Sequence, residues 1–216
     1  MDARRRLHSD DRRCILSASG PLLILTIALI AVVTCAACLP VMRVLRRTDC
    51  VDVPNDRSSH NAPVPRGGGL AILSAMAIFA AIAAIAPLGF SPAVWAAVAG
   101  AVALALLGFA DDVTQLKPHP RLLAQIGIGA AVGAAMGAVP GAMLGAVMVP
   151  TAVNMVNFMD GINGLCAGHA VVWGFGALVG ASSGGGEVLA VLGAVSLGGG
   201  LGFLPWNVPN AHLFLG

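Results

Sequence analysis

Residues 122–159 read LLAQIGIGAAVGAAMGAVPGAMLGAVMVPTAVNMVNFM, and this run contains no Asp, Glu, Lys or Arg. A helix that crosses a lipid bilayer needs about 20 mostly apolar residues, so the run is long enough for two crossings. Pro140 and Gly141 stand near its middle, and such a pair commonly marks a turn. The stretch therefore predicts a hairpin of two membrane-spanning helices.

Charge-free runs make up most of the remaining chain. They cover residues 14–42, 67–110, 161–186 and 188–216, and the second of them is also long enough for a hairpin. Only 10% of the residues are charged, whereas soluble domains carry about 25%. Because lipid offers no hydrogen-bond partners to the backbone, the spanning segments must be helical.

We therefore predict an all-α, polytopic transmembrane helix bundle with about seven spans. The expected helices cover residues 20–42, 68–87, 92–109, 121–139, 141–157, 165–182 and 188–205. Residues 1–19 are expected to form an N-terminal polar segment, and residues 20–216 a single membrane domain. A cleaved signal peptide at the N-terminus is the alternative to an uncleaved first helix.

The joints between the predicted helices form two sets. Those after the second, fourth and sixth helices are short, and Glu187 is their one charged residue. The others hold the remaining charges outside the N-terminus, including Arg43, Arg66 and Lys117. Basic loops stay in the cytoplasm, so we expect these loops to share the cytoplasmic face. The arginines of the N-terminal segment would then lie outside, against the same rule.

The first joint contains a cluster of possible anion ligands, DVPNDRSSHNAPVPRGGG at residues 52–69. Arg57, His60 and Arg66 offer donors. Gly67–Gly69 allow the backbone to approach a ligand closely at the start of a helix, where free N–H groups favour phosphate. The cluster predicts a phosphate-binding loop, and a basic loop that only orients the protein in the membrane is the alternative.

Two adjacent carboxylates, Asp111 and Asp112, end the third predicted helix. Negative charge is unfavourable at a helix C-terminus, so another group must offset it. Mg²⁺, Lys117 and Arg121 are the candidates. Carboxylates that hold a metal ion suit phosphoryl transfer, because the ion neutralises phosphate oxygens. Two solvated acids at the membrane surface are the alternative.

A third polar cluster, NMVNFMDGING at residues 154–164, leaves the fifth predicted helix. Asn154, Asn157 and Asp160 are spaced by three residues, which puts them near one helical face. Their side chains could recognise a nucleotide or complete a metal site. The alternative is that Asp-Gly and Asn-Gly are simply turn formers, which does not explain two amides inside a span. A fourth cluster, PWNVPNAHLFLG, ends the sequence at residues 205–216.

Together these motifs carry a family resemblance. Three patterns match in order: Asp-x-Pro-x-x-Arg-Ser-x-His-x-x-Pro-x-Pro-Arg-Gly-Gly-Gly, Gly-x-x-Asp-Asp with a later Arg-Leu-x-x-Gln, and Asn-Phe-Met-Asp-Gly-Ile-Asn-Gly. From about residue 20 to the end, the sequence resembles the polyprenyl-phosphate N-acetylhexosamine-1-phosphate transferases of glycosyltransferase family 4.

The resemblance implies roles for individual residues. Asp111 and Asp112 match the catalytic pair, and with Asp160 they are expected to hold Mg²⁺, with Mn²⁺ as the alternative ion. Asn154, Asn157 and Asp160 match polar active-site positions. Asn207 and Phe214 resemble residues of the nucleotide pocket. Asn163 stands where many relatives have Asp, and it is expected to bind substrate with Arg57, His60 and Arg66.

The expected reaction moves a sugar 1-phosphate from a UDP-sugar to polyprenyl phosphate and releases UMP. The expected place is the cytoplasmic face of a bacterial plasma membrane. The resemblance is compatible with a homodimer, and it implies no nucleic-acid partner. A phospho-MurNAc-pentapeptide transferase, a transporter and an inactive remnant are the alternatives. The family continues after the position of Gly216 with Asp-x-Gly-Ser, whose Asp is a metal ligand. We therefore expect a C-terminally incomplete chain that folds without turning over.

Overall fold

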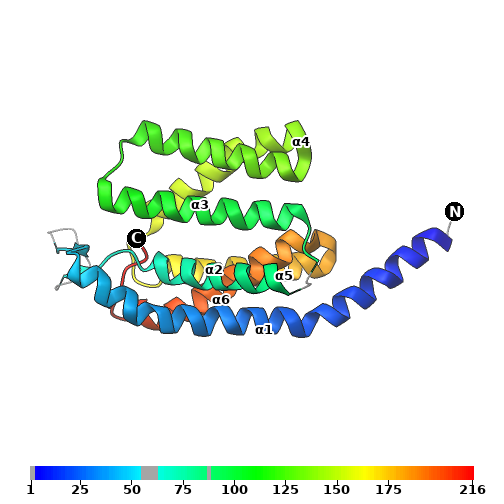
Figure 1. The fold of residues 1–216 in the computed structure, drawn as a ribbon, viewed down its shortest axis with the longest axis horizontal. Helices are drawn as coiled ribbons and strands as arrows, with labels where there is room; N and C mark the ends of the chain where they lie inside the picture. The colour runs from blue at the N-terminus through cyan, green and yellow to red at the C-terminus, as the bar shows by residue number, and fades with distance from the viewer. Residues whose placement is uncertain (1–2, 55–62, 87–88) are drawn as a thin grey trace.

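The structure is a computed structural model that describes residues 3–54, 63–86 and 89–216, with side chains from Gly20 onward (Figure 1). Its helices are α1 (Ala3–Arg47), α2 (Gly69–Ile85), α3 (Pro92–Thr114), α4 (Pro118–Met159), α5 (Leu165–Gly180) and α6 (Gly186–Asn207). The π-helical turn η1 (Ala181–Gly185) joins α5 to α6. Two short antiparallel strands, β1 (Val51–Asp52) and β2 (Val64–Pro65), lie between α1 and α2.

Four helical stretches in the described part of the chain are long and apolar enough to cross a membrane. They are Gly20–Arg47, Pro92–Thr114, Pro118–Met159 and Leu165–Asn207, and α2 is a shorter apolar helix. The predicted all-α membrane bundle is confirmed. The count of seven spans stays a prediction.

Two of the four stretches double back on themselves. Helix α4 loses helical backbone angles at Gly137 and Ala138, directly before Pro140. The two arms then approach so closely that a Cβ on Gly133 would overlap the carbonyl oxygen of Gly141. Small residues permit this kind of helix contact in membranes. The stretch from α5 to α6 reverses at η1, where Gly184 has a φ of 107°.

The observed boundaries differ from the predicted ones chiefly at α1 and α3. Helix α1 begins at Ala3, not residue 20, and continues through Pro40 to Arg47. Helix α3 continues beyond residue 109 to Thr114. Charged side chains at the ends of a span do not stop the helix, because the backbone can go on making its own hydrogen bonds in the interfacial layer. The length of an apolar run therefore indicates the lipid-buried part of a helix and not its full length.

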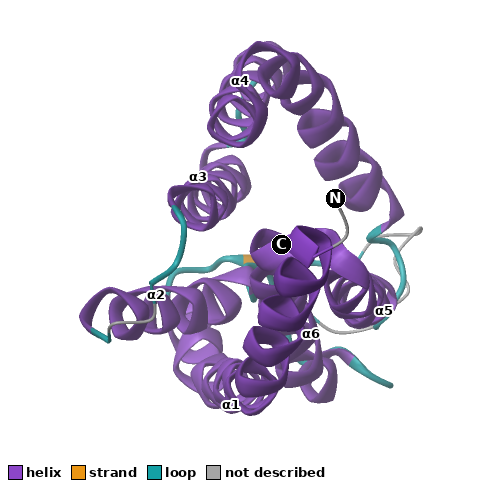
Figure 2. Ribbon diagram, turned by 90° about the vertical axis from the view of Figure 1, so that its right-hand side faces the viewer, coloured by secondary structure: helices purple, strands orange, loops and turns teal. Residues whose placement is uncertain are grey.

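Helix α6 lies between α1 and α5 and packs against both (Figure 2). One buried cluster joins α1, α2, α3 and α6 and includes Ile30, Phe79, Val94 and Val195. A second cluster lies nearer the loops and includes Cys38, Leu45, Ala71, Phe203 and Leu213. Through Leu213, the second cluster holds the C-terminal segment against α1, α2 and α6.

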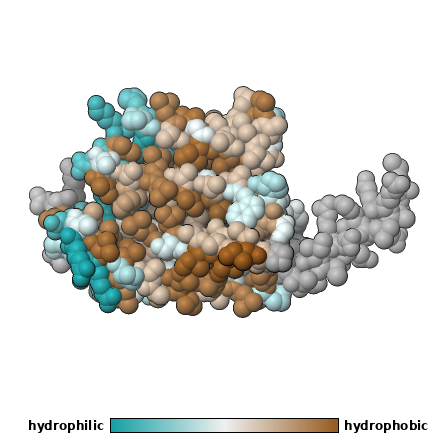
Figure 3. Space-filling view, viewed as in Figure 1, coloured by the Kyte–Doolittle hydropathy of each residue, from teal (hydrophilic) through white to brown (hydrophobic). Residues whose placement is uncertain are grey.

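Hydrophilic residues gather at one end of the bundle, and most of the remaining visible surface is hydrophobic (Figure 3). The C-terminal segment turns back at this end and pairs with the start of α2. The N–H of Gly68 donates to the oxygen of Phe214, and the N–H of Gly69 donates to the oxygen of Leu215, both at 2.7 Å. The N-terminal end of α1 lies at the far end of the molecule (Figure 1).

Candidate active site

A cavity of about 570 Å³ opens at the hydrophilic end, between α2, α3 and the two arms of α4. Its size is within the range of small-molecule sites. Among the described residues, its charged lining consists of Arg66, Asp111, Asp112, Arg121 and Asp160. Each of these comes from a motif that the sequence analysis singled out.

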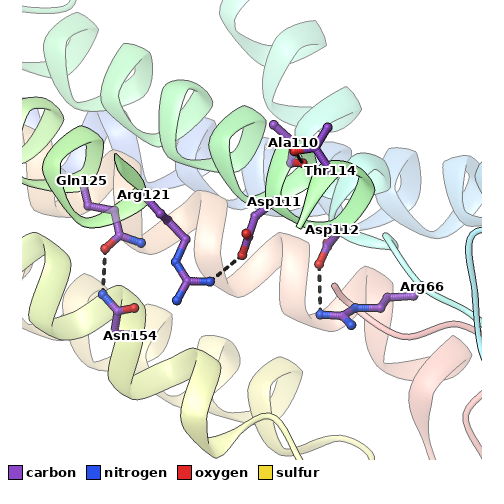
Figure 4. Close-up of polar contacts among 8 residues, drawn as sticks. All are labelled: Arg66, Ala110, Asp111, Asp112, Thr114, Arg121, Gln125 and Asn154. Carbon is purple, nitrogen blue, oxygen red and sulfur yellow. Dashed lines mark hydrogen bonds and ion pairs between the residues drawn. The ribbon is translucent and has the colours of Figure 1, made fainter. Parts of the chain in front are cut away.

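Asp111 lies in the last turn of α3 and is paired across the cavity. Its Oδ2 accepts a hydrogen bond from Nη1 of Arg121, on the first turn of α4, at 2.5 Å (Figure 4). The two helices reverse direction at Gln115, which has a left-handed φ of 50°. Of the groups predicted to offset the carboxylate pair, the structure therefore places Arg121 on Asp111.

Asp112 has a different partner. Its Oδ1 lies 3.0 Å from Nη2 of Arg66, which precedes α2 (Figure 4). Arg66 also forms a parallel bridge with Phe214, so the C-terminal segment steadies its backbone. The Asp112 side chain is 18% exposed and that of Arg66 is 48% exposed. The guanidinium group can therefore turn to another anion at small cost.

An amide pair closes the opposite wall of the cavity. Nδ2 of Asn154 donates to Oε1 of Gln125 and to the carbonyl of Pro150, both at 2.7 Å. Gln125 is 4% exposed and stands on the first arm of α4, whereas Asn154 stands on the second. The pair joins the two arms at the cavity. Sequence reasoning gave Gln125 no role, although an amide inside a charge-free span was a visible signal.

Asn157 and Asp160 line the same cavity, as their spacing predicts. Burial raises the pKa of the Asp160 carboxyl, while a hydrogen bond from Cys166 and the charge of Arg66 oppose that rise. The thiol of Cys166 lines the cavity too and also contacts the carbonyl of Val156 at 3.6 Å. Sequence reasoning did not place this cysteine at the site.

Three predicted substrate residues stand outside the cavity lining and hold the neighbouring loops. Asn207 is 7% exposed; its Oδ1 accepts from the N–H of Gly164, and its Nδ2 donates to the carbonyl of Leu213 at 3.0 Å. Asn163 donates to the carbonyl of Pro209 at 3.2 Å. Phe214 takes part through its backbone, since its N–H donates to the carbonyl of Pro65 at 2.9 Å. Their contact with substrate stays a prediction, as does that of Arg57 and His60, which lie outside the described residues.

The charge of the cavity bears on a metal ion. Asp111, Asp112 and Asp160 face only two guanidinium groups among the described residues, so the charged lining carries one more negative group than positive groups. No three acidic, imidazole or thiol groups within the described ranges stand close enough to form a metal site by themselves. Mg²⁺ is usually held by one or two carboxylates together with substrate phosphates. The carboxylates therefore fit an Mg²⁺ ion that binds together with a phosphate-bearing ligand.

Comparison with known proteins agrees with this picture. Residues 94–216 match the model of the family described as glycosyl transferase family 4. The chain is 30% identical, over 82% of its length, to the "Probable undecaprenyl-phosphate N-acetylglucosaminyl 1-phosphate transferase" of Bacillus subtilis, of which the match covers 53%. It is 32% identical, over 86% of its length, to a decaprenyl-phosphate N-acetylglucosaminephosphotransferase of Mycobacterium tuberculosis, with 54% of that protein covered.

A further relative, matched over a shorter part of the chain, has a name that refers to a different sugar. The chain is 30% identical, over 51% of its length, to a phospho-N-acetylmuramoyl-pentapeptide-transferase of Symbiobacterium thermophilum, with 42% of that protein covered. The chain thus spans about half the length of the curated relatives it matches.

Proposed function

Because this chain belongs to glycosyl transferase family 4, we propose that it transfers N-acetylhexosamine 1-phosphate from a UDP-sugar to a polyprenyl phosphate and releases UMP. The observation that carries the proposal is the cavity at the hydrophilic end of the bundle. There, two adjacent carboxylates each hold a guanidinium group from a different segment. Such a site can accept both a water-soluble diphosphate and the head of a membrane lipid.

In the proposed reaction, an oxygen of the polyprenyl phosphate forms a bond to the β-phosphorus of the UDP-sugar. The bond from that phosphorus to the oxygen bridging to UMP breaks, and UMP leaves with the electron pair. A phosphate monoester has a second pKa of about 6, so the nucleophile is largely ionised at neutral pH. The carboxylates are then needed chiefly to position charged groups and less to remove a proton.

The two ion pairs supply the donors for the phosphates. Arg66 and Arg121 each pair with a carboxylate, and a guanidinium group can also bind phosphate oxygens, in a forked geometry. We expect both arginines to move from carboxylate to phosphate when the donor binds. One or two of the carboxylates predicted as ligands, Asp111, Asp112 and Asp160, would then hold Mg²⁺ together with the phosphates, and the ion would neutralise charge on the diphosphate.

The amide wall positions the donor. Asn154 keeps a fixed orientation because Gln125 and the carbonyl of Pro150 both accept from its amide nitrogen, which leaves its oxygen for a ligand. Asn157 stands one turn further along the same cavity wall. We assign these amides to recognition of the nucleotide or the acetamido sugar.

The proposed location is a bacterial plasma membrane, with the cavity on its cytoplasmic face. Arg43, Arg46 and Arg47 lie near the C-terminal end of α1, at the same end of the bundle as the C-terminal segment (Figure 1), and basic residues are retained on the cytoplasmic side. UDP-sugars are made in the cytoplasm, so the donor would reach the cavity from there.

The test is an assay, with polyprenyl phosphate and Mg²⁺, of the protein extended to the length of its relatives. The 216 residues alone are assayed beside it, to test the expectation that they fold without turning over. We expect UDP-N-acetylglucosamine to give UMP and lipid-linked sugar in equal amounts, chelation by EDTA to stop both, and added Mg²⁺ or Mn²⁺ to restore them. Preference for UDP-MurNAc-pentapeptide would identify that nucleotide, and not UDP-N-acetylglucosamine, as the donor. Movement of intact UDP-sugar into vesicles without UMP would contradict the proposal and indicate a transporter.

A further inference from the structure

Gln125 and Asn154, the amide pair that joins the two arms of α4, both line the polar cavity. One neighbouring carbonyl fixes which of their atoms are nitrogen and which are oxygen. The carbonyl of Pro150 can only accept a hydrogen bond, so the Asn154 atom 2.7 Å from it is Nδ2. The Gln125 atom 2.7 Å from that nitrogen is then Oε1. Both hydrogens of Nδ2 are used, so neither amide can turn over without losing a contact.

This arrangement leaves one acceptor and one donor of the amide pair without a partner. No described residue donates to Oδ1 of Asn154 or accepts from Nε2 of Gln125. The two atoms lie on the same side of the pair, toward Arg121 and Asp111 (Figure 4). Gln125 is 4% exposed, and a buried N–H group without a partner is costly. The pair is therefore suited to a ligand in the cavity that supplies both missing contacts.

The combination of a donor and an acceptor restricts the chemistry of that ligand. An ionised phosphate would accept from Nε2 of Gln125, but it has no hydrogen to offer Oδ1 of Asn154. A metal ion would suit the oxygen and be repelled by the N–H group. A neutral group that both donates and accepts, such as a hydroxyl or an acetamido group, satisfies both atoms. The amide pair therefore differs in specificity from the charged lining of the same cavity.

The amide pair lies close to a group expected to bind phosphate. Gln125 follows Arg121 by four residues on the first arm of α4, which is one helical turn, or about 6 Å along the axis. In a UDP-sugar, the sugar is joined directly to the β-phosphate, whereas the uracil base lies beyond a second phosphate and a ribose. With the β-phosphate at Arg121, the sugar is the neutral part of the molecule that is nearest to the pair.

We propose that Gln125 and Asn154 form a subsite for the sugar of the donor. In this subsite, Oδ1 of Asn154 accepts from a hydroxyl or the acetamido group of the sugar, and Nε2 of Gln125 donates to it. Gln125 also keeps Asn154 in place, because its Oε1 holds the Asn154 nitrogen away from the ligand. The subsite rests on the proposed function for the identity of the donor, and it adds a specificity-determining residue, Gln125, to that function.

The test compares a ligand that has the sugar with one that lacks it. The protein extended to the length of its relatives is titrated calorimetrically with UDP-N-acetylglucosamine and with UDP, in the presence of Mg²⁺ and without polyprenyl phosphate. Gln125→Met and Asn154→Leu should each raise the Kd for UDP-N-acetylglucosamine by about tenfold, equivalent to about 1.4 kcal/mol of binding, and leave the Kd for UDP unchanged. The double variant should lose little more than either single variant, because each amide depends on the other for its orientation.

Gln115→Met is the matched control, because Gln115 is exposed and does not line the cavity. It should change neither Kd. Thermal unfolding identifies a variant that does not fold. If Gln125→Met is such a variant, Gln125→Asn takes its place, since its side chain stays polar but is one CH₂ group too short to reach Asn154. UDP-glucose, which has a hydroxyl in place of the acetamido group, then shows which group of the sugar the pair contacts.

Equal weakening of UDP and UDP-N-acetylglucosamine in a folded Gln125 variant would overturn the subsite, because the pair would then act on the nucleotide or on the packing of the arms. An unchanged Kd for both ligands would overturn it as well. Titration reports binding alone, so selective loss of UDP-N-acetylglucosamine in a protein that releases no UMP would support the subsite and contradict the proposed function. Release of UMP without selective loss would do the reverse.

Discussion

Asp111 and Asp112 present a problem of charge at the scale of single residues. They end α3, where the helix dipole disfavours negative charge, and they lie next to each other. The structure gives each one its own guanidinium group, Arg121 from α4 and Arg66 from the segment before α2. These pairs tie three segments together around the cavity. The same four groups supply most of the charged lining of the cavity.

Asp111→Asn and Asp112→Asn should each reduce UMP release by about 10²–10³-fold, the usual effect of losing one charged contact to a transition state. An amide keeps the shape of the side chain but cannot hold a cation as a carboxylate does. Release of UMP from UDP-N-acetylglucosamine is the measurement. Thermal unfolding in detergent is the control and should change little. A variant with near-normal turnover would remove that aspartate from the catalytic pair.

Arg121→Gln should lower kcat/KM for the UDP-sugar by about 10²-fold, because a charge-assisted donor to phosphate is lost. Lys117→Gln removes a positive charge from the same loop, but Lys117 does not line the cavity. It should therefore leave kcat/KM almost unchanged. Equal losses in the two variants would mean that the loop acts through general electrostatics and not through a specific contact.

At the scale of elements, the α4 hairpin determines how wide the cavity is. Its arms meet through Gly129 and Gly145 and through Gly133 and Gly141, with no room for a Cβ. At the open end, the Gln125–Asn154 hydrogen bond holds the arms together. Close packing along the hairpin therefore sets the position of an amide at the site.

Gly133→Ala should destabilise the protein by about 1–3 kcal/mol, since overpacking a tight contact forces backbone shifts. Gly127→Ala is the matched control on the same arm, because a Cβ there meets nothing within 4 Å. The control should be neutral or slightly more stable. Thermal unfolding of both variants in the same detergent measures the difference. Equal midpoints would contradict the close contact between the two arms.

At the scale of the whole molecule, the face drawn in Figure 3 is mostly hydrophobic, and hydrophilic residues gather at one end of it. The loops after α1, α3 and α4 and the C-terminal segment meet there, and the reversal at η1 lies toward the opposite end (Figure 1). This arrangement keeps the lipid-facing helices apolar and brings all the charged cavity residues to one membrane face.

Labelling of single cysteines should reveal that sidedness. With Cys14, Cys35, Cys38, Cys50 and Cys166 replaced, Gln115→Cys should react in intact cells only with a membrane-permeant maleimide. Ser183→Cys, in η1, should react with an impermeant one. Gln115 follows α3 on the cavity side, which we place in the cytoplasm. Strong labelling by the impermeant reagent at position 115 but not at position 183 would show that the protein has the opposite orientation in the membrane.

The amino-acid sequence by itself determined the membrane bundle and most of the charged cavity lining. Runs without charge, such as residues 122–159, have few options other than spanning helices, because lipid penalises unpaired backbone. Asp111, Asp112, Asp160, Asn154 and Asn157 could be recognised since their types and spacing are local properties. The boundaries of α1 could not, because hydropathy reports the lipid-buried part of a helix and not where helical hydrogen bonding ends.

Only the tertiary structure decided which partners meet. It paired Arg66 with Asp112 and Arg121 with Asp111, buried Gln125 against Asn154, and showed that Asn207 holds the turn at Gly164 and the C-terminal segment. It also left an apolar hollow between α1 and α2, which shares Leu70 and Leu73 with the cavity. The partners in these contacts are not separated by any fixed number of residues along the chain. Their distance in space depends on how whole helices pack. Residue type sets what a side chain can bind, but the packing of distant segments sets what lies within its reach.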